Sequence, residues 1–252
     1  MNPAVQSISA FFPCYNDEAT IARMVELAAS TIDECGVDGE IIVINDGSTD
    51  RSAEVIAAAA AREPRLRIVT HESNRGYGGA LLSGFAAATR QWVFYTDGDA
   101  QFDPTELALL VDAAADDVDV VQGYKIRRAD NIARRVIGRV YHRFVAFAFR
   151  LEIRDTDCDF RLIRKSALDR VALVHSTGVI CVELVCKLQD SGARFVEVPI
   201  HHYAREHGQS EFFRFTRVVR SLKDLVGLWF REVLLRRGRA EGTGDSPSGR
   251  AA

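Results

Sequence analysis

The chain has 252 residues, of which 47% are apolar and 27% are charged. This inventory excludes a wholly disordered chain, and the length suits one large α/β domain or two small ones. The five cysteines show no Cys-x-x-Cys or Cys/His metal spacing, which indicates reduced thiols. The N-terminal residues lack the basic start of a signal peptide, and no apolar stretch approaches the roughly 20 residues of a spanning helix. We therefore expect a cytoplasmic protein without a transmembrane segment.

The net charge of −3 hides a difference between the two halves of the chain. Residues 1–120 contain 7 basic and 20 acidic residues, a balance of −13, whereas residues 121–252 contain 25 basic and 15 acidic residues, a balance of +10. Dispersed surface charge is one explanation. The other is that the C-terminal half meets phosphates or an anionic surface.

Apolar runs typical of strands alternate with helical patterns through the first part of the chain. The helical patterns cover residues 18–30, 52–62, 78–88 and 104–115, and Asp103 before Pro104 is a predicted N-cap. Such alternation predicts an α/β fold with a mostly parallel sheet covered on both faces. The strand-like runs are SISAFF, EIIVIN, LRIVT, WVFYT and VDVVQG.

The pattern changes after residue 123. A helical stretch is predicted over 131–151, a short strand over 160–163, a helix over 179–191 and a strand at RFVEVPI. A last amphipathic helix follows at 211–237, and the small polar residues 238–252 predict a disordered tail. The predicted organisation is a main domain at 1–210, the amphipathic helix and the tail.

Polar segments follow four of the predicted strands: PCYND, NDGSTD, HESNRGYGG and TDGDAQ. In an open parallel sheet, ligands bind at the carboxyl ends of the strands, so these segments predict a binding site there. A dinucleotide-binding fold would carry glycines directly after its first strand. Because residues 13–17 contain no glycine, NAD binding is disfavoured.

Asp97 and Asp99 stand one residue apart at the end of the run WVFYT. In an extended segment they and Gln101 would point to one side. Two neighbouring carboxylates favour either a shared proton or a bound cation. Oxygen ligands are typical of Mg²⁺ or Mn²⁺ sites, and phosphates of the substrate often complete the coordination shell of such a metal. The alternative is a polar turn. A calcium-binding EF-hand is excluded because Ala108 holds the twelfth position.

Between residues 7 and 210 the chain contains six motifs in this order: PCYND, VINDGSTDRS, NRGYGGALLSG, TDGDAQ, DCDFRLIRK and VEVPIHHYAREHGQS. Their order and spacing resemble the inverting family 2 glycosyltransferases. The resemblance is strongest to the branch of dolichol-phosphate mannose synthase and bacterial polyprenyl-phosphate sugar synthases. It implies a GT-A-like three-layer fold with a nucleotide-binding N-terminal half. It also implies metal-dependent transfer of a sugar from a nucleotide-diphosphate sugar to a polyprenyl phosphate.

The resemblance also assigns roles to the residues of the donor site. Asp97 and Asp99 would hold Mg²⁺ or Mn²⁺, with Asp99 as the direct ligand and Asp97 also beside the nucleotide sugar. Gln101 would lie near the sugar or the acceptor phosphate. Asp46 would accept hydrogen bonds from the nucleoside. Alternatively, the NDGS sequence at residues 45–48 is typical of a turn, and Asp46 would then have only a structural role. The predicted contacts to the base, ribose and nucleoside are Pro13, Tyr15, Asp17 and Asp46.

The acceptor decides which groups the catalytic site requires. An alcohol needs a carboxylate base, whereas a phosphate monoester is already anionic near pH 7 and needs cations and orientation instead. Two departures from the family pattern bear on this choice: Asp159 replaces a usual glycine, and Glu211 replaces a usual basic residue. Either carboxylate would adjust acceptor choice or supply a base. The predicted acceptor-phosphate residues are Lys125, Arg127, Arg134, Arg135, Arg205 and Ser210, and Arg205 is also a predicted catalytic residue.

Two segments, ARRVIGRVYHRFVAFAFR and FFRFTRVVRSLKDLVGLWFREVLLRR, combine apolar residues at helical spacing with repeated arginines. Helices packed on the sheet with a solvated basic face would look similar. Together, the two segments predict reversible docking of a peripheral enzyme at the cytoplasmic face of a membrane. Nucleic acid is not a predicted partner.

Two other enzymatic functions remain open from the sequence. One is a transferase of the same fold that acts on a soluble alcohol. The other is a phosphohydrolase with a nucleophilic aspartate, which would carry its paired aspartates after the first strand and a threonine or valine where Gln101 stands. A non-catalytic membrane-binding module would leave the four polar strand ends unexplained.

Overall fold

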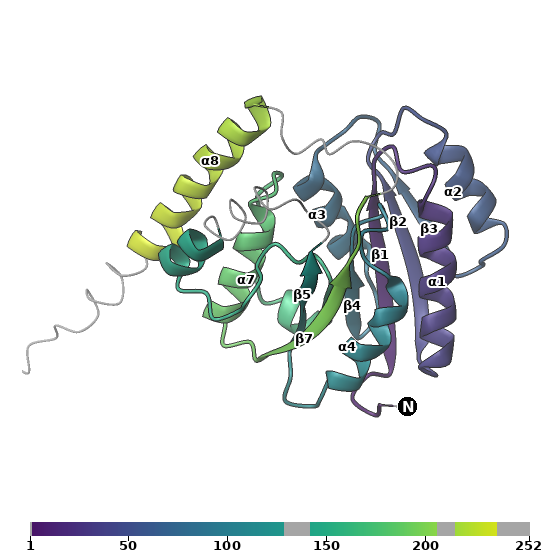
Figure 1. Ribbon diagram of the computed structural model, residues 1–252, viewed down its shortest axis with the longest axis horizontal. Coiled ribbons are helices and arrows are strands. Elements are labelled where there is room, and N and C mark those ends of the chain that lie inside the picture. The colour runs from purple at the N-terminus through teal and green to yellow at the C-terminus, as the bar shows by residue number, and fades with distance from the viewer. Residues whose placement is uncertain (1, 129–141, 206–214, 236–252) are drawn as a thin grey trace, which may run out of the picture.

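The computed structural model describes residues 2–128, 142–205 and 215–235, which form a central sheet with helices on both faces (Figure 1). The sheet has seven strands in the order β3-β2-β1-β4-β6-β5-β7. Strand β6 is antiparallel to β4 and β5, and the other pairs are parallel. The strands are β1 (Ser7–Cys14), β2 (Asp38–Asn45), β3 (Leu66–Thr70), β4 (Trp92–Tyr95), β5 (Val120–Arg128), β6 (Arg161–Arg164) and β7 (Phe195–His202).

Crossover helices join the parallel strands, and further helices complete the C-terminal half. Residues 142–149 are also helical. The other helical elements are α1 (Ile21–Glu34), α2 (Ser52–Ala60), α3 (Tyr77–Ala87), η1 (Pro104–Glu106), α4 (Leu107–Ala113), α6 (Lys165–Leu168), α7 (Ile180–Asp190), α8 (Phe215–Trp229) and the π-helical η3 (Phe230–Leu235).

The sheet buries side chains on both faces because successive residues of a strand point to opposite sides. On β2, Ile41 and Val43 belong to a core shared with α1, α2 and α4, whereas Ile42 and Ile44 belong to a core shared with α3 and α7. The sequence therefore predicts the three-layer α/β architecture correctly, including the near-continuous apolar strands.

A third apolar cluster fixes the C-terminal helix to the domain. Leu225 and Leu228 of α8 are buried against α7 and the helix at 142–149. The indole nitrogen of Trp229 donates a hydrogen bond to the carbonyl of Ala148 over 3.1 Å, and Thr177 donates to Asp224 over 2.9 Å. One face of α8 is thus part of the folded core.

Most of the predicted element boundaries lie within a few residues of those found. Helix α1 begins at Ile21, after the predicted start, and Asp103 caps η1 as predicted by accepting from the amide of Thr105 over 3.0 Å. The antiparallel direction of β6 was not predicted. The structure does not describe residues 129–141, 206–214 and 236–252. Parts of the helices predicted at 131–151 and 211–237, and the whole of the predicted tail, therefore lie outside the described residues. None of the described helices is long and apolar enough to cross a membrane.

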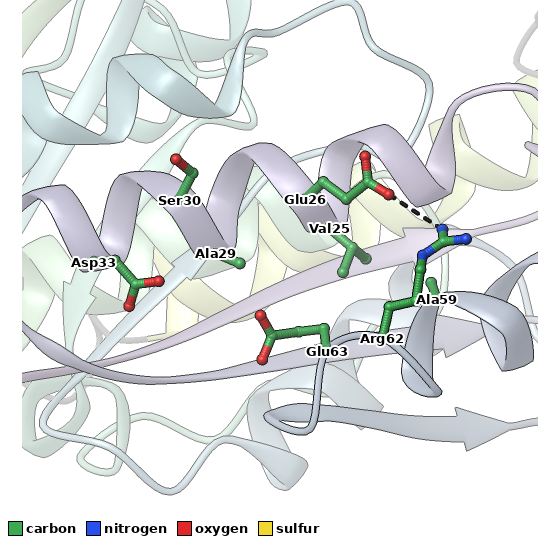
Figure 2. A pocket seen from close by; sticks show the side chains of 8 residues that line it. All are labelled: Val25, Glu26, Ala29, Ser30, Asp33, Ala59, Arg62 and Glu63. Carbon is green, nitrogen blue, oxygen red and sulfur yellow. Dashed lines mark hydrogen bonds and ion pairs between the residues drawn. The ribbon is translucent and has the colours of Figure 1, made fainter.

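A shallow hollow opens on the outer surface between α1 and the end of α2 (Figure 2). Arg62 and Glu26 form an ion pair of 3.1 Å at its rim. None of the predicted site residues lines this hollow. Its lining residues are Val25, Glu26, Ala29, Ser30, Asp33, Ala59, Arg62 and Glu63.

Candidate functional site

The carboxyl ends of β1, β2 and β4 lie side by side and bring three of the polar segments together. Cys14 at the end of β1 pairs in register with Asn45 at the end of β2, and Phe11 pairs with Tyr95 at the end of β4. The segment after β1 and the segment after β4 touch closely: a Cβ added at Gly98 would lie 2.9 Å from the carbonyl oxygen of Pro13. Glycine between the two aspartates therefore allows this approach.

The paired aspartates lie on a turn and not on an extended segment. The chain turns at residues 98–99, and Ala100 has a φ of 59°. The side chain of Asp99 accepts a hydrogen bond from the amide of Gln101 over 3.0 Å. The expectation that Gln101 points to the same side as the aspartates on an extended strand is therefore wrong, because this turn redirects the chain.

Gln101 instead connects the turn to the segment that follows β7. Its side-chain amide donates to the carbonyl of Tyr203 over 3.3 Å, and the amide of Tyr203 donates to the carbonyl of Gln101 over 2.8 Å. These bonds bring Arg205 to Asp99, with which it forms an ion pair. The acidic N-terminal half and the basic C-terminal half thus meet at the predicted site.

Asp97 is the least satisfied acidic group of the site. Its Oδ1 atom is buried and has no hydrogen-bond partner among the described residues. Burial, and then repulsion from Asp99 and Asp159, hold its pKa well above the usual range, while the nearby hydroxyl of Tyr77 acts in the opposite direction. A cation beside Asp97 would favour its charged form.

The arrangement fits a divalent cation that the donor helps to bind. Within the described residues no group of three or more histidine, cysteine or acidic side chains is arranged to hold a metal ion by itself. Asp97 and Asp99 supply carboxylate oxygens at one turn, which is the usual protein contribution when substrate phosphates complete the shell of Mg²⁺ or Mn²⁺. The residues present therefore suit the predicted metal.

Asp46 has a different environment at the end of β2. Its Oδ1 contacts His71 Nδ1 at 2.6 Å and accepts from the amide of Arg75 at 2.8 Å, and its Oδ2 accepts from the amide of Gly76 at 3.0 Å. The side chain is 4% exposed. Asp46 thus holds the loop between β3 and α3. Its predicted contact with a nucleoside stays a prediction.

Asp17 lies in the loop between β1 and α1, where the base and ribose are predicted. It accepts from the amide of Tyr15 over 3.1 Å, while Ser52 accepts from its own amide over 3.0 Å. Burial raises the pKa of Asp17 to about 6, with a further contribution from Asp99. That influence shows that Asp17 and the paired aspartates share one electrostatic environment.

The predicted acceptor cations are only partly within the described residues. Lys125 donates to the carbonyl of Asp157 over 2.6 Å, and its Nζ lies 5.8 Å from the centroid of the Phe102 ring. Arg127 lies on β5 opposite His201 of β7. Arg134, Arg135, Ser210 and Glu211 lie outside the described residues.

The sequence reasoning missed the role of Arg161, which is 1% exposed. Its guanidinium donates to the hydroxyl of Tyr95, to Asp159 over 3.0 Å and to the carbonyl of Thr156 over 2.5 Å. Asp159, noted as a departure from the family pattern, therefore has a buried cationic partner. An arginine inside the apolar stretch FRLI was the available signal, because buried arginines need several acceptors.

Comparison with known proteins identifies the family of the chain. The model of glycosyl transferase family 2 matches residues 9–172, and the chain belongs to that family. It is therefore a glycosyltransferase with the GT-A fold.

Curated relatives include the undecaprenyl-phosphate 4-deoxy-4-formamido-L-arabinose transferases of Edwardsiella ictaluri and of an Enterobacter species. Each is 30% identical to this chain, over 224 and 226 residues respectively, covering 88% of this chain and 67% of the relative.

Solved structures confirm the fold. Glucosyl-3-phosphoglycerate synthase from Mycobacterium tuberculosis, in complex with Mn²⁺, UDP and glucosyl-3-phosphoglycerate, superposes with a TM-score of 0.70 at 18% identity, covering 90% of this chain and 80% of that one. The same enzyme with Mg²⁺ and UDP gives a TM-score of 0.65 at 18% identity, covering 88% of this chain and 80% of that one. These comparisons confirm the predicted family and three-layer fold.

Proposed function

We propose that this protein transfers a sugar from a nucleotide-diphosphate sugar to a polyprenyl phosphate, with inversion at the sugar carbon and with Mg²⁺ or Mn²⁺ as cofactor. The observation that supports the acceptor most strongly is the 30% identity to undecaprenyl-phosphate transferases over 88% of the chain. That similarity extends beyond the 9–172 segment matched by the family model. It also agrees with the basic character of the C-terminal half.

The reaction forms a bond between the acceptor phosphate oxygen and C1 of the sugar, and it breaks the bond between C1 and the nucleoside diphosphate. Inversion requires attack from the face opposite the leaving group. Asp97 and Asp99 would hold the metal ion, which supplies positive charge to the diphosphate. Tyr15 and Asp17, which follow β1, would border the nucleoside.

A phosphate acceptor requires positive charge and not a base. Among the described residues, Arg205 is a cation that contacts the paired aspartates directly, through its ion pair with Asp99. Its guanidinium would orient the acceptor phosphate toward C1. Asp159 has its carboxylate bound to Arg161, so it is a poor base for an alcohol. This contact favours the phosphate acceptor over the soluble alcohol.

An extraction assay tests the proposed reaction. The protein is incubated with a panel of radiolabelled nucleotide sugars, Mg²⁺ or Mn²⁺, and one of three acceptors: polyprenyl phosphate, the corresponding polyprenol or a soluble alcohol such as 3-phosphoglycerate. We expect label in the organic phase only with the polyprenyl phosphate. Label on the soluble acceptor would replace this proposal with the alcohol-acceptor function, and release of free phosphate would indicate the phosphohydrolase.

We also propose that the enzyme docks on an anionic membrane surface through α8, η3 and the helix at 142–149. Leu222, Val226, Phe230 and Leu234 recur every four residues and are 53%, 67%, 50% and 46% exposed. This spacing places side chains on one helical face. Phe144 and Phe147 on the neighbouring helix are 64% and 86% exposed.

Exposed cations accompany this apolar surface, as an anionic bilayer requires. Arg143, Arg220 and Lys223 are all exposed. Each basic residue near an anionic leaflet contributes roughly 1 kcal/mol before screening by salt. The surface differs from the one expected from sequence, because Leu225 and Leu228 face α7 and are unavailable to lipid.

Vesicle co-sedimentation tests the docking surface. The double variant Val226→Gln/Phe230→Gln should lose binding to anionic vesicles, whereas Leu109→Gln, at a leucine of α4 that is 44% exposed, should keep it. Binding of the wild type should fall as salt rises. Equal recovery of the wild type in the supernatant with and without anionic vesicles would contradict docking.

A further inference from the structure

Near the end of β4 and the start of α3, three buried polar atoms have no hydrogen bond among the described residues: Tyr77 Oη, Thr96 Oγ1 and Asp97 Oδ1. Buried polar groups in native proteins are nearly always satisfied, and leaving one unpaired costs about 1–3 kcal/mol. Thr96 and Asp97 directly follow β4, and Tyr77 is the first residue of α3. Two of these atoms can pair within the site itself, because the Tyr77 hydroxyl is near enough to Asp97 to lower the pKa of that carboxyl group, against the larger effect of burial.

The backbone around Tyr77 is tightly constrained. Gly76 has a φ of 82°, which favours glycine, and its amide donates to Asp46 over 3.0 Å. A Cβ added at Gly78 would lie 2.5 Å from the carbonyl carbon of Ser176, so the start of α3 packs directly on the 175–177 segment. These contacts fix the position of Tyr77 while leaving its hydroxyl unpaired.

We propose that Tyr77 is a positioning residue for the donor site: its hydroxyl donates a hydrogen bond to Asp97 when the donor binds and would orient that carboxylate toward the metal ion that the diphosphate also binds. The inference rests on the proposed function for the class of donor. It explains why a rigidly held tyrosine keeps a buried, unpaired hydroxyl near a carboxylate that also has an unpaired oxygen. Unpaired polar groups of this kind cost stability and are retained where binding needs them.

The variant Tyr77→Phe removes only the hydroxyl. Since that hydroxyl has no hydrogen bond, the melting temperature should stay the same or rise. Affinity for a nucleoside diphosphate in the presence of Mn²⁺ should fall by about tenfold, the scale of one hydrogen bond to a charged group. Tyr124→Phe is the matched control, because Tyr124 lies on β5 with its ring against Arg154 at 5.0 Å, and it should change neither quantity.

A double-mutant cycle separates positioning from a structural role. If Tyr77 acts through Asp97, then Tyr77→Phe should change the affinity of an Asp97→Asn protein by less than about twofold. The probes are UDP, GDP, CDP and TDP, each with Mn²⁺, followed by calorimetry.

Three results would each overturn the positioning role. The first is full affinity in Tyr77→Phe, and the second is an equal loss of affinity when Tyr77→Phe is added to Asp97→Asn. The third is a loss of affinity accompanied by a lower melting temperature. A wild-type protein that binds none of the four nucleotides would overturn the proposed function as well. If the wild type binds and Tyr77→Phe binds equally, only the inference about Tyr77 fails.

Discussion

The ends of β2 and β4 both present a buried aspartate, but the two carboxylates have opposite environments. Asp46 receives two backbone amides and a contact with His71, so its oxygens are satisfied by the protein. Asp97 has a buried oxygen with no partner among the described residues, and Asp99 beside it faces Arg205. A satisfied acid stabilises a loop, whereas an unsatisfied acid is available to a ligand. The contrast distinguishes an acid that holds the scaffold from the acids that are predicted to bind the metal and the donor.

Asp99→Asn should produce the largest effect on turnover. The substitution removes the charge that a divalent ion and Arg205 both require, so transfer should fall by more than about 10³-fold while the circular dichroism spectrum stays native. The control is Asp112→Asn, at an exposed aspartate of α4, which should retain full activity. Unchanged turnover in a folded Asp99→Asn protein would remove the paired aspartates from the mechanism.

Arg205→Ala should lower turnover with a polyprenyl phosphate by a factor on the order of 10², the scale of one positioned charge-assisted contact. Steady-state rates at saturating donor measure this effect. Arg62→Ala is the control, because Arg62 pairs with Glu26 at the outer hollow (Figure 2), which none of the predicted site residues lines. If turnover falls by the same small factor in both variants, Arg205 has no specific role in orienting the acceptor phosphate.

Asp46→Ala should act mainly on stability. It leaves the amides of Arg75 and Gly76 without their acceptor, so the free energy of unfolding should fall by about 2–4 kcal/mol in urea denaturation. Asp38→Ala provides the comparison, because the ion pair of Asp38 with Arg90 at 2.9 Å is exposed, and its loss should cost less than about 1 kcal/mol. If the two variants lose similar stability, Asp46 is not a structural clamp.

Asp17→Asn should have a smaller effect on stability than Asp46→Ala, and the effect should depend on pH. The pKa of Asp17 is raised in the folded state from 3.8 to about 6. Between these values the folded protein binds the additional proton, so the stability from Asp17 is present below pH 4 and is lost as pH rises toward 6. Denaturation from pH 4 to pH 7 should therefore show a shallower decline in Asp17→Asn. A decline equal to that of the wild type would contradict the raised pKa.

Most of the fold could be predicted because it depends on local patterns. The apolar runs of the parallel strands, the crossover helices and the cap at Asp103 each follow from neighbouring residues. The antiparallel β6 could not be predicted, because its direction depends on pairing with β4 and β5, which lie 69 and 41 positions earlier in the chain by their first residues. Pairing between distant segments has no local signal.

The candidate site was predictable in composition and less so in geometry. The sequence places Asp97, Asp99 and Asp17 at strand ends, and the structure brings them into one electrostatic environment. It did not predict that Asp99 turns the chain and ties Gln101 to Tyr203, or that the Tyr77 hydroxyl lies near Asp97. Such contacts depend on the exact course of loops that several elements hold together. The same limit applies to α8, because the apolar pattern of the sequence does not distinguish the buried Leu225 and Leu228 from the exposed residues of that helix.

The most direct test of this account is a crystal structure of the protein with Mn²⁺ and a nucleoside diphosphate, in which anomalous scattering locates the metal. The account predicts one strong anomalous peak at the end of β4, about 2.1 Å from a carboxylate oxygen of Asp99 or Asp97, with the diphosphate completing the shell. It also predicts that Asp46 keeps its bonds to the amides of Arg75 and Gly76. A bound nucleotide whose metal lies elsewhere, with Asp97 and Asp99 unliganded, would contradict the account.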